Sequence, residues 1–554
     1  MKKLGLLIIV FNALICSTWA VPARRDGIVK TQPDGSQVTV YQHGDEHFHW
    51  TTNKNGEWLK MDIDGFYRVT EAMSEKEIEA KRMTTPSRAT QKSTPLNIAP
   101  RGLVILVNFQ DLAFETTKLE MDSMLTAENY TREYEYTHRN QTYHITSRGS
   151  ARQYFYDSSH GQYDPQFDVV GPVTVSEKMS HYGKNTAGFD ANPWQMVKEA
   201  CELVNDSIDF TLYDNDDDGC VDFVYVIYAG FGEADGGDKN TIWPHSYALS
   251  SAGTYCKVDE KQVDLYACGN ELDYFSKKHT GIGTFCHEFS HVLGLPDMYE
   301  TTGNGTHKTL GAWSIMDYGS YNNESNTPPA YSAYERFFMG WLSPQLIVDS
   351  AEMQLPELNS SNHAMLIAEN DQHNLIGNDP DTTVFYLLEN RQQSGWDEYL
   401  PGHGMMLTKV DYKHRSWSNN TVNNNSKDMG VDLIEAKVNK GPSDKATDLF
   451  PEGATKYLHI KDHSICNIKE TEGVIHFRYR MVALPEEEEE EEEEKEDEEK
   501  EEEEDVAVED VFVEHQVQAI YNTLGQKQTH CVIEHLPQGT YIVVTTSGTY
   551  KIAR

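Results

Sequence analysis

The chain has 554 residues, enough for about three or four domains of average size, and its hydrophobic content of 38% is sufficient for a folded core. Its formal net charge is −41; residues 486–505 hold 18 acidic residues and two lysines, so the rest of the chain still carries −25. An acidic chain without a basic stripe excludes a nucleic-acid-binding protein, and we expect no nucleic acid as a partner.

A secretory signal peptide is predicted at residues 1–20. Two lysines precede an apolar run over residues 4–15, and small residues lead up to Ala20, after which we expect cleavage. The alternative of a membrane anchor is disfavoured because the run is too short to span a bilayer, and no later segment is apolar enough. Seven cysteines remain after cleavage, with no C-x-x-C pair, so a cysteine zinc cluster is not expected.

Residues 21–97 are polar and rich in turns. Short alternating runs between Asp-Gly and Asn-Gly pairs predict small β-hairpins. A charged and then Ser/Thr/Pro-rich stretch follows, which is typical of a cleavable linker, and its basic residues Lys81, Arg82 and Arg88 suit a processing protease.

Two apolar runs, residues 101–111 and 221–233, predict central strands of a sheet that is buried on both faces. Helices are predicted at residues 191–206 and around residue 287. From about residue 350 to 482 short alternating strands predict a β-rich region. Residues 483–508 then form an acidic linker with no core, and residues 509–554 a small β module.

The segment "HEFSHVLGLPD", residues 287–297, has the pattern of a zinc site. On a helix, His287 and His291 fall on one face and can hold one zinc ion together, while Glu288 projects beside the metal, where it can deprotonate a bound water. Gly294 allows a sharp turn out of the helix, which brings Asp297 back towards the ion as a third ligand. Alternatively, the Asp297 carboxylate orients a neighbour.

A second element, "GAWSIMDYGSY", follows 25 residues later and contains Met316 and Tyr318. Metzincins carry a methionine turn below the zinc, and the combination with the first motif favours that role for Met316 over an ordinary core methionine.

With these motifs, the chain resembles the immune inhibitor A family of secreted bacterial zinc metalloproteases over most of residues 21–482. The resemblance also rests on "ARQYFYDSSHGQYDPQFDVVGPV" and "IWPHSY". It implies a zinc-dependent endopeptidase that is made as a zymogen, with Glu288 as general base and His287, His291 and Asp297 as metal ligands. "SIMDY" is similar to the S-I-M-x-Y turn of astacins and serralysins, which implies that Tyr318 stabilises the tetrahedral intermediate; a packed or surface tyrosine is the alternative.

Latency has its own candidates in the segment "HGDEHFH". Residues 21–97 contain no cysteine, which excludes a cysteine switch. One hypothesis is that Asp45 or Glu46 occupies the open position of the zinc until the segment is removed. The alternative is a solvated turn.

The segment "DNDDDGCVD", residues 214–222, predicts a structural calcium site. Alternating carboxylates with a glycine at the sixth place suit a hard, oxygen-seeking ion. The pattern departs from an EF-hand because position 12 is Tyr225 and a strand follows, and an unoccupied Asp-rich turn is the alternative. The expected ligands are Asp214, Asp216, Asp218 and Asp222.

The C-terminal module resembles the sorting domains of proteins exported by type IX secretion, in "IYNTLGQKQ" and "LPQGTYIVV". The resemblance implies the type IX machinery as a partner, and a cell-surface or extracellular location in a Gram-negative bacterium. A small adhesion or carbohydrate-binding domain is the alternative.

Taken together, the sequence predicts an α+β protein. A metzincin-like catalytic domain with a mixed sheet and an active-site helix (98–345) lies between a β-rich propeptide (21–97) and a β-rich domain (346–482). The predicted function is a secreted zinc endopeptidase, made as a zymogen, that hydrolyses proteins or peptides. The alternative is a surface-attached adhesion or binding protein whose protease fold is incidental or inactive.

Overall fold

The computed structural model describes residues 21–45, 48–74, 77–78, 99–186, 189–301, 307–439, 444–461, 463–480, 517–522, 540–545 and 549–553. The predicted signal peptide, Lys81, Arg82, Arg88 and the glutamate run lie outside these residues. The chain divides into two compact units, Met1–Val482 and Ala483–Arg554. No helix in the described ranges is long and apolar enough to cross a membrane.

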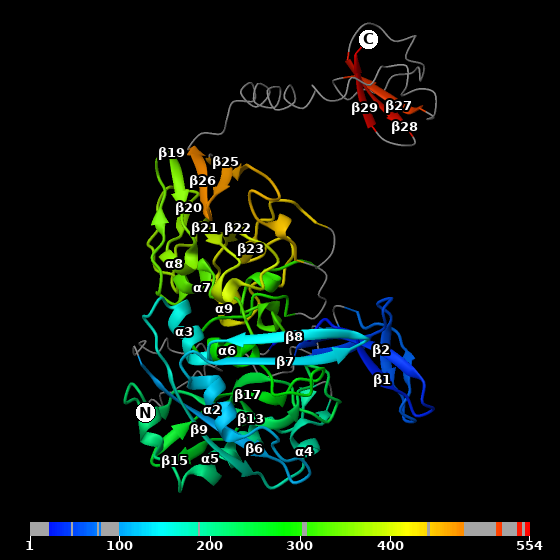
Figure 1. The fold of residues 1–554 in the computed structure, drawn as a ribbon, viewed down its shortest axis with the longest axis vertical. Coiled ribbons are helices and arrows are strands. Elements are labelled where there is room, and N and C mark those ends of the chain that lie inside the picture. Colours follow the sequence, from blue (N-terminus) through cyan, green and yellow to red (C-terminus); the bar gives the residue numbers. More distant parts are fainter. Residues whose placement is uncertain are drawn as a thin grey trace, which may run out of the picture. The chain divides into compact units, whose positions relative to one another are not determined.

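The N-terminal part of the first unit folds as a five-stranded antiparallel sheet (Figure 1). Three of its connections are the predicted Asp-Gly and Asn-Gly turns, whose glycines adopt the positive φ that such turns require. The predicted hairpins are therefore present. Their strands are β1 (Ile28–Thr31), β2 (Gln37–Asp45), β3 (Phe48–Thr52), β4 (Trp58–Met61) and β5 (Tyr67–Val69).

The central sheet also has five strands, four of them parallel, with β14 antiparallel at one edge. The two strands predicted from apolar runs, β6 and β13, are adjacent in its middle. In spatial order the sheet consists of β14 (His245–Ala248), β17 (Leu265–Leu272), β13 (Val224–Phe231), β6 (Arg101–Asn108) and β9 (Gln166–Thr174).

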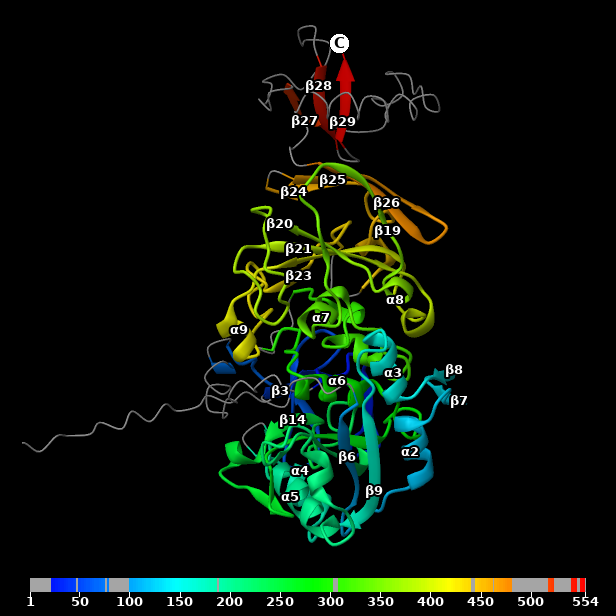
Figure 2. The same ribbon diagram turned by 90° about the vertical axis from the view of Figure 1, so that its left-hand side faces the viewer.

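Both faces of the central sheet are buried, which explains why β6 is apolar throughout. Leu103 and Ile105 belong to a core shared with α5 (Pro193–Val204), whereas Val104 and Leu106 belong to a core on the opposite face. That second core includes side chains of α2 (Lys118–Thr126), α3 (Ala151–Ser158) and α6 (Gly283–Val292). Figure 2 shows α4 (Met179–Gly183) and α5 together beside the sheet, with α2 and α3 apart from them.

A long hairpin of β7 (Thr131–His138) and β8 (Gln141–Arg148) extends from this part of the molecule towards the N-terminal sheet (Figure 1). At its turn, the Arg139 guanidinium donates to the Gly27 carbonyl. Shorter elements complete the region: β10 (Asn185–Thr186), β11 (Phe189–Asp190), β12 (Cys220–Val221), β15 (Cys256–Val258), β16 (Lys261–Val263) and α7 (Ala333–Phe338).

Residues 345–480 form two sheets packed face to face. The first has the order β18 (Gln345–Leu346), β20 (Met365–Ala368), β21 (Phe385–Arg391), β22 (Gly404–Val410) and β23 (Val431–Leu433). The second has the order β19 (Ala351–Leu355), β26 (Val474–Arg480), β25 (His463–Thr471) and β24 (Tyr457–Ile460). Two short helices, α8 (Leu358–Ser361) and α9 (His414–Ser418), lie in the connections of this region.

The first of these sheets has two buried faces. Leu388 and Met405 pack towards the second sheet, whereas their neighbours Leu387 and Met406 belong to the core that contains Phe289 of α6. This alternation follows from the two-residue period of a strand. The β-rich region and the helix with the HExxH motif therefore share one hydrophobic core.

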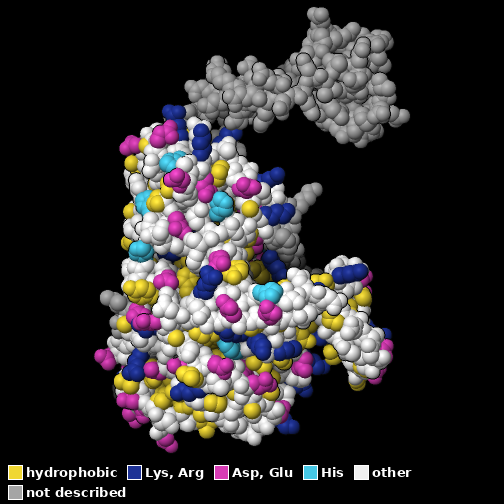
Figure 3. Space-filling view, in the orientation of Figure 1, with side chains coloured by type: hydrophobic (Ala, Val, Ile, Leu, Met, Phe, Trp, Pro, Cys, Tyr) yellow, Lys and Arg dark blue, Asp and Glu magenta, His cyan; other side chains and the backbone are white. Residues whose placement is uncertain are grey.

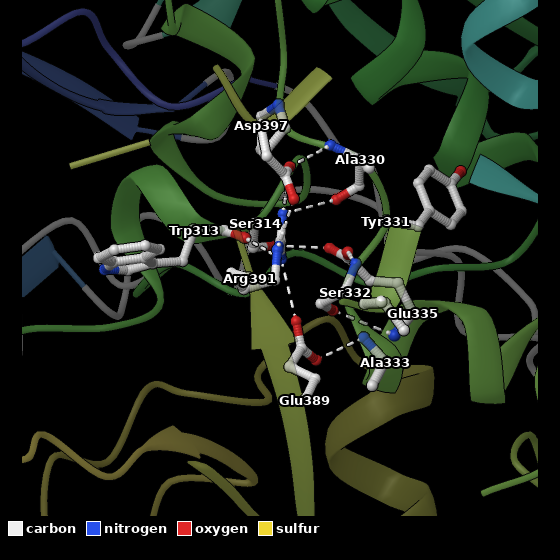
Figure 4. Close-up of polar contacts among 12 residues, drawn as sticks. Trp313, Ser314, Ala330, Tyr331, Ser332, Ala333, Glu335, Glu389, Arg391 and Asp397 are labelled. Atoms are coloured by element: carbon white, nitrogen blue, oxygen red, sulfur yellow. Dashed lines mark hydrogen bonds and ion pairs between the residues drawn. The ribbon is translucent and has the colours of Figure 1, made fainter. Parts of the chain in front are cut away.

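A buried arginine joins the same two parts (Figure 4). Arg391 on β21 pairs with Asp397 at 2.6 Å and with Glu389 at 3.0 Å, and it donates to the carbonyls of Trp313 and Ala330. Burial of an arginine is tolerated here because every donor direction meets a carboxylate or a carbonyl. The segment before Met316 is thereby attached to the β-rich region.

The second unit contains a three-stranded antiparallel sheet of β27 (Val517–Asn522), β28 (Thr540–Thr545) and β29 (Thr549–Ala553).

On the face of the first unit drawn in Figure 3, acidic and basic side chains are interspersed rather than separated into patches of one sign.

Candidate metal centre and cleft

The helix α6 (Gly283–Val292) is buried along its whole length. Phe285 and Phe289 point to the central sheet, where their rings contact Tyr225 and Phe223 at centroid distances of 4.5 and 4.6 Å. His287 and His291 are offset by two residues from these aromatics and so lie on the opposite face of the helix. The helix ends in a tight turn in which Gly294 has a φ of +105°, a conformation that side chains rarely adopt.

Three ligand atoms converge beyond that turn. The Nε2 atoms of His287 and His291 lie 3.0 Å apart, and Asp297 Oδ1 lies 3.2 Å from each of them. All three residues are fully or almost fully buried. The structure thus brings together the three metal ligands predicted from the sequence.

The hydrogen bonds of the two imidazoles show that these residues fit a cation. His287 Nδ1 lies 2.7 Å from the Ile315 carbonyl and His291 Nδ1 lies 2.8 Å from the Leu295 carbonyl, so each Nδ1 donates and each Nε2 presents a lone pair in the neutral ring. Burial lowers the pKa of His291 and favours that neutral form. Two lone pairs and a carboxylate oxygen then face one another without a proton to share, an arrangement that a bound zinc ion stabilises.

The orientation of the Asp297 carboxylate is fixed by an amide from the β-rich region. Asn420, which follows α9 in the β-rich region, accepts from the Asp297 backbone N–H at 2.7 Å and donates to Asp297 Oδ2. This amide leaves Oδ1 directed at the histidines.

The turn that contains Met316 orients His287 through a backbone carbonyl. Met316 is fully buried, and its N–H donates to Ser314 Oγ at 3.0 Å. Ser314 Oγ in turn donates to Glu335 Oε1 at 2.6 Å, a contact drawn in Figure 4. The carbonyl that orients His287 belongs to Ile315, the residue before Met316.

Glu288 contacts the N-terminal segment of the chain. The Val21 N–H donates to Glu288 Oε1 at 2.8 Å, across 267 residues of sequence. The following carbonyls are also bound: Trp243 Nε1 donates to Val21 O at 3.0 Å and the Tyr321 hydroxyl donates to Pro22 O at 2.7 Å. Neither Trp243 nor Tyr321 was predicted as a functional residue, although "IWPHSY" includes the tryptophan.

Two arginines continue this segment. Arg24 is 5% exposed, its N–H donates to the Ala234 carbonyl at 3.0 Å, and its guanidinium lies among carboxylates of three loops. Arg25 lies over the ring of Tyr318, with its Cζ 3.4 Å from the centroid. Burial raises the pKa of Tyr318, and the charge of Arg25 opposes that rise. The predicted catalytic tyrosine is therefore covered by residue 25.

The latency hypothesis for Asp45 needs correction. The Asp45 carboxylate accepts from the Phe48 N–H of its own hairpin, and Asp45 is not part of the described ligand group. Glu46 lies outside the described residues. The nearby His49 stacks on Trp243 with ring centroids 4.7 Å apart. The N-terminal residue that the structure brings to Glu288 is Val21.

The predicted calcium loop is only partly assembled. Ligand atoms of Asp214, Asp216 and Asp218 lie within 4.8 Å of one another. Asp222 is not in that group, because its carboxylate accepts from the backbone and side-chain amides of Asn215 at 2.6 and 2.8 Å. The Lys261 ammonium pairs with Asp214, and thus already supplies a positive charge.

Asn420 gives the first testable expectation. We expect Asn420→Ala to weaken zinc binding by about 10- to 100-fold, because the carboxylate of Asp297 loses the amide that orients it. Competition with a chromogenic chelator measures this affinity. Asn424→Ala is a matched control, since Asn424 accepts from Thr301 rather than Asp297, and we expect it to bind zinc as the unchanged chain does. Equal zinc affinity of both variants would contradict the positioning role of Asn420.

Comparison with known proteins agrees with the geometry of this centre. Residues 96–342 match the family model described as "Immune inhibitor A peptidase M6, catalytic domain". The chain is 30% identical over 217 residues to immune inhibitor A of Bacillus thuringiensis subsp. alesti, which covers 34% of this chain and 31% of that protein.

It is also 28% identical over 274 residues to the pre-pro-metalloprotease PrtV of Vibrio cholerae serotype O1, which covers 43% of this chain and 29% of PrtV. The chain therefore matches only about a third of the length of these relatives. Over residues 96–342, the chain is similar to the catalytic domain of the immune inhibitor A peptidase M6 family.

Proposed function

We propose that this chain is a zinc-dependent endopeptidase, secreted as a zymogen. The observation that carries the proposal is the buried convergence of His287 Nε2, His291 Nε2 and Asp297 Oδ1, with Glu288 on the same helix. The family match over residues 96–342 supports the same activity.

Each residue has a distinct role in this proposal. His287, His291 and Asp297 would hold the zinc ion, whose chemistry when bound is Lewis acidity: it polarises a peptide carbonyl and makes a water molecule acidic. Glu288 would take the proton of the attacking water and pass it to the leaving amine. Trp243 and Tyr321 would hold the substrate backbone. Tyr318, once Arg25 leaves, would donate to the developing oxyanion.

The activity is tested with Glu288→Gln, which keeps the size of the side chain and removes its basicity. We expect casein hydrolysis by the activated enzyme to fall by at least about 100-fold, since general base catalysis contributes that much, while bound zinc remains. Zinc content measured by atomic absorption separates loss of catalysis from loss of metal.

Glu260→Gln, an exposed change of the same kind, is the control and should leave hydrolysis unchanged. A chelator should abolish the activity of the control. Full activity of Glu288→Gln, or activity insensitive to the chelator, would contradict the proposed endopeptidase. Such a result would favour the alternative, a binding protein whose protease fold is inactive.

Latency is proposed to come from residues 21–25. Their contacts with Glu288, Trp243, Tyr321 and Tyr318 support this, because a peptide in that place denies a substrate access. If the signal peptide is cleaved after Ala20, the Val21 N–H becomes the α-amino group of the chain. Its positive charge would strengthen the hydrogen bond to the Glu288 carboxylate.

A two-residue Gly-Ser extension before Val21 tests this form of latency. It replaces the charged amine by a neutral amide, and a charged hydrogen bond contributes about 1.5–3 kcal/mol, so we expect casein hydrolysis before activation to rise at least about 10-fold. The same two residues inserted in the exposed turn at Asp34 and Gly35 are the control. Equal latency of both chains would contradict the role of the Val21 amine.

The C-terminal unit is proposed to direct export by type IX secretion and attachment at the surface of a Gram-negative bacterium. Its three-stranded sheet is compatible with this module and equally with a small binding domain. Deletion of residues 483–554 distinguishes the two. A sorting module predicts retention of the protein in the periplasm, whereas a binding module predicts normal export with loss of adhesion.

A structural calcium ion at Asp214, Asp216 and Asp218 is a further proposal, with Asp222 in a supporting role. Sites in extracellular proteins bind calcium at about 0.1–1 mM, so we expect about 1 mM calcium, but not magnesium, to raise the thermal unfolding temperature. Lys261→Ala should increase the calcium affinity, because the ammonium no longer competes for Asp214. The absence of a calcium effect in both chains would leave the segment as an Asp-rich turn.

A further inference from the structure

The guanidinium of Arg24 contacts four carboxylates: its Nε lies 2.8 Å from Asp26 Oδ2 of the same N-terminal segment, and the other three carboxylates form a pocket around it. Its Nη1 is 3.0 Å from Asp235 Oδ1 and 2.8 Å from Asp273 Oδ2, and its Nη2 contacts Glu324. The ring of Phe275 lies 4.4 Å from Arg24 Cζ and closes one side of the pocket. All four pocket residues belong to the segment 96–342, whereas Arg24 belongs to the N-terminal segment.

The pocket is held in shape by its own backbone. Asp235 Oδ2 accepts from the Tyr274 N–H at 3.1 Å, and Asp273 Oδ1 accepts from the N–H groups of Phe275 and Ser276 at 3.1 and 2.6 Å. Each of these carboxylates therefore uses one oxygen for a loop and directs the other at the guanidinium. These hydrogen bonds do not involve residues 21–45, so they persist when Arg24 is removed.

The direction in which residues 21–24 run past Glu288 shows which residue of a substrate Arg24 corresponds to. Hydrolysis of a peptide bond creates a new amine on the C-terminal product, and Glu288 is the group proposed to give that amine its proton. The Val21 nitrogen lies 2.8 Å from Glu288 Oε1, and residues 21–24 run away from it. Trp243, Tyr321 and Ala234, all in the segment 96–342, bind their backbone. Val21 thus lies as the first residue after the cleaved bond would, and Arg24 as the fourth.

We propose that Asp235, Asp273 and Glu324 form a specificity subsite of the activated enzyme for a basic side chain, arginine above all, at the fourth residue after the scissile bond. The inference rests on the proposed endopeptidase function. Arginine is preferred over lysine because its planar fork reaches carboxylates on several sides at once, whereas an ammonium is a single point of charge.

Removal of Arg24 leaves the carboxylates of Asp235, Asp273 and Glu324 without their counterion, and a substrate arginine can replace it. Burial and the charge of Asp273 raise the pKa of Asp235 to about 8, and Arg24 opposes that rise. When the N-terminal segment departs, the three acidic groups lose their counterion, so the pocket takes up a proton or another cation. A substrate with arginine in the fourth position restores the ion pairs and gains affinity from them.

The test is a cleavage-site profile of the trypsin-activated full chain on a denatured bacterial proteome, read by mass spectrometry after the trypsin is inhibited. We expect arginine to be enriched at the fourth residue after the cut. For one cleaved peptide, replacement of that arginine by glutamine should lower kcat/KM by about 30-fold, the loss expected when a buried charge pair loses one partner.

Variants of the pocket attribute the preference to it. Asp273→Asn keeps the acceptor for the loop and removes the charge, so the ratio of kcat/KM for the arginine and glutamine peptides should fall towards one. Glu324→Lys places an ammonium group beside Asp235 and Asp273, where it competes with a substrate arginine, so the preference for arginine should be lost. Asp238→Asn makes the same charge change on an exposed carboxylate of the loop that contains Asp235 and should keep the ratio. Because each ratio is measured within one protein, partial loss of folded enzyme does not alter it.

The outcomes separate the two proposals. Arginine enrichment that falls in Asp273→Asn and is kept in Asp238→Asn supports the subsite. Efficient cleavage without enrichment at the fourth residue, or enrichment unchanged in both pocket variants, overturns the subsite and leaves the endopeptidase standing. The absence of any cleavage by the activated chain overturns the endopeptidase, and the subsite with it.

Discussion

The rest of this structure depends on one electrostatic constraint: two imidazole lone pairs and a carboxylate oxygen are held within 3.2 Å of one another in the protein interior. Such a group repels itself unless a cation lies between its members. The fold resists that repulsion with rigid partners, since the carbonyls of Ile315 and Leu295 orient the rings and the amide of Asn420 orients the carboxylate.

These partners come from widely separated parts of the chain. Ile315 follows Trp313 by two residues, and the Trp313 carbonyl accepts a hydrogen bond from Arg391 of β21. Asn420 lies in the connection between β22 and β23. The β-rich region therefore contributes to the candidate metal centre. We expect substitutions there to weaken metal binding by changing the orientation of the candidate ligands, as is typical of residues that contact metal ligands from outside.

Much of this was predictable from the sequence. The periodicity of "HEFSHVLGLPD" and the φ preference of Gly294 were enough to predict that His287, His291 and Asp297 lie together, because their geometry depends on one helix and one turn. The two-sided burial of β6 followed from its unbroken apolar run, and the N-terminal hairpins followed from their Asp-Gly and Asn-Gly pairs. Local rules suffice where the contacting residues are close in sequence.

The rest depended on contacts with no local signal. Asn420 is 123 residues from Asp297, and Val21 is 267 residues from Glu288, so no spacing rule connects them. Asp222 does not join the predicted calcium group, because its carboxylate accepts hydrogen bonds from Asn215 within the same motif. Asp45 was predicted to face the zinc site because it is acidic. In the structure its carboxylate accepts from the Phe48 N–H of its own hairpin instead.

The shared core makes the β-rich region part of the same hydrophobic core as the helix α6. The match to the family's catalytic domain ends at residue 342, but Leu387 and Met406 of the following sheet pack into the same core as Phe289. A fragment that ends at residue 342 would expose that apolar surface to water and would lack Asn420 as well. The segment that matches the family is therefore shorter than the part of the chain that builds this core, and we expect a chain that ends at residue 342 to be less stable and to hold the candidate ligands less firmly.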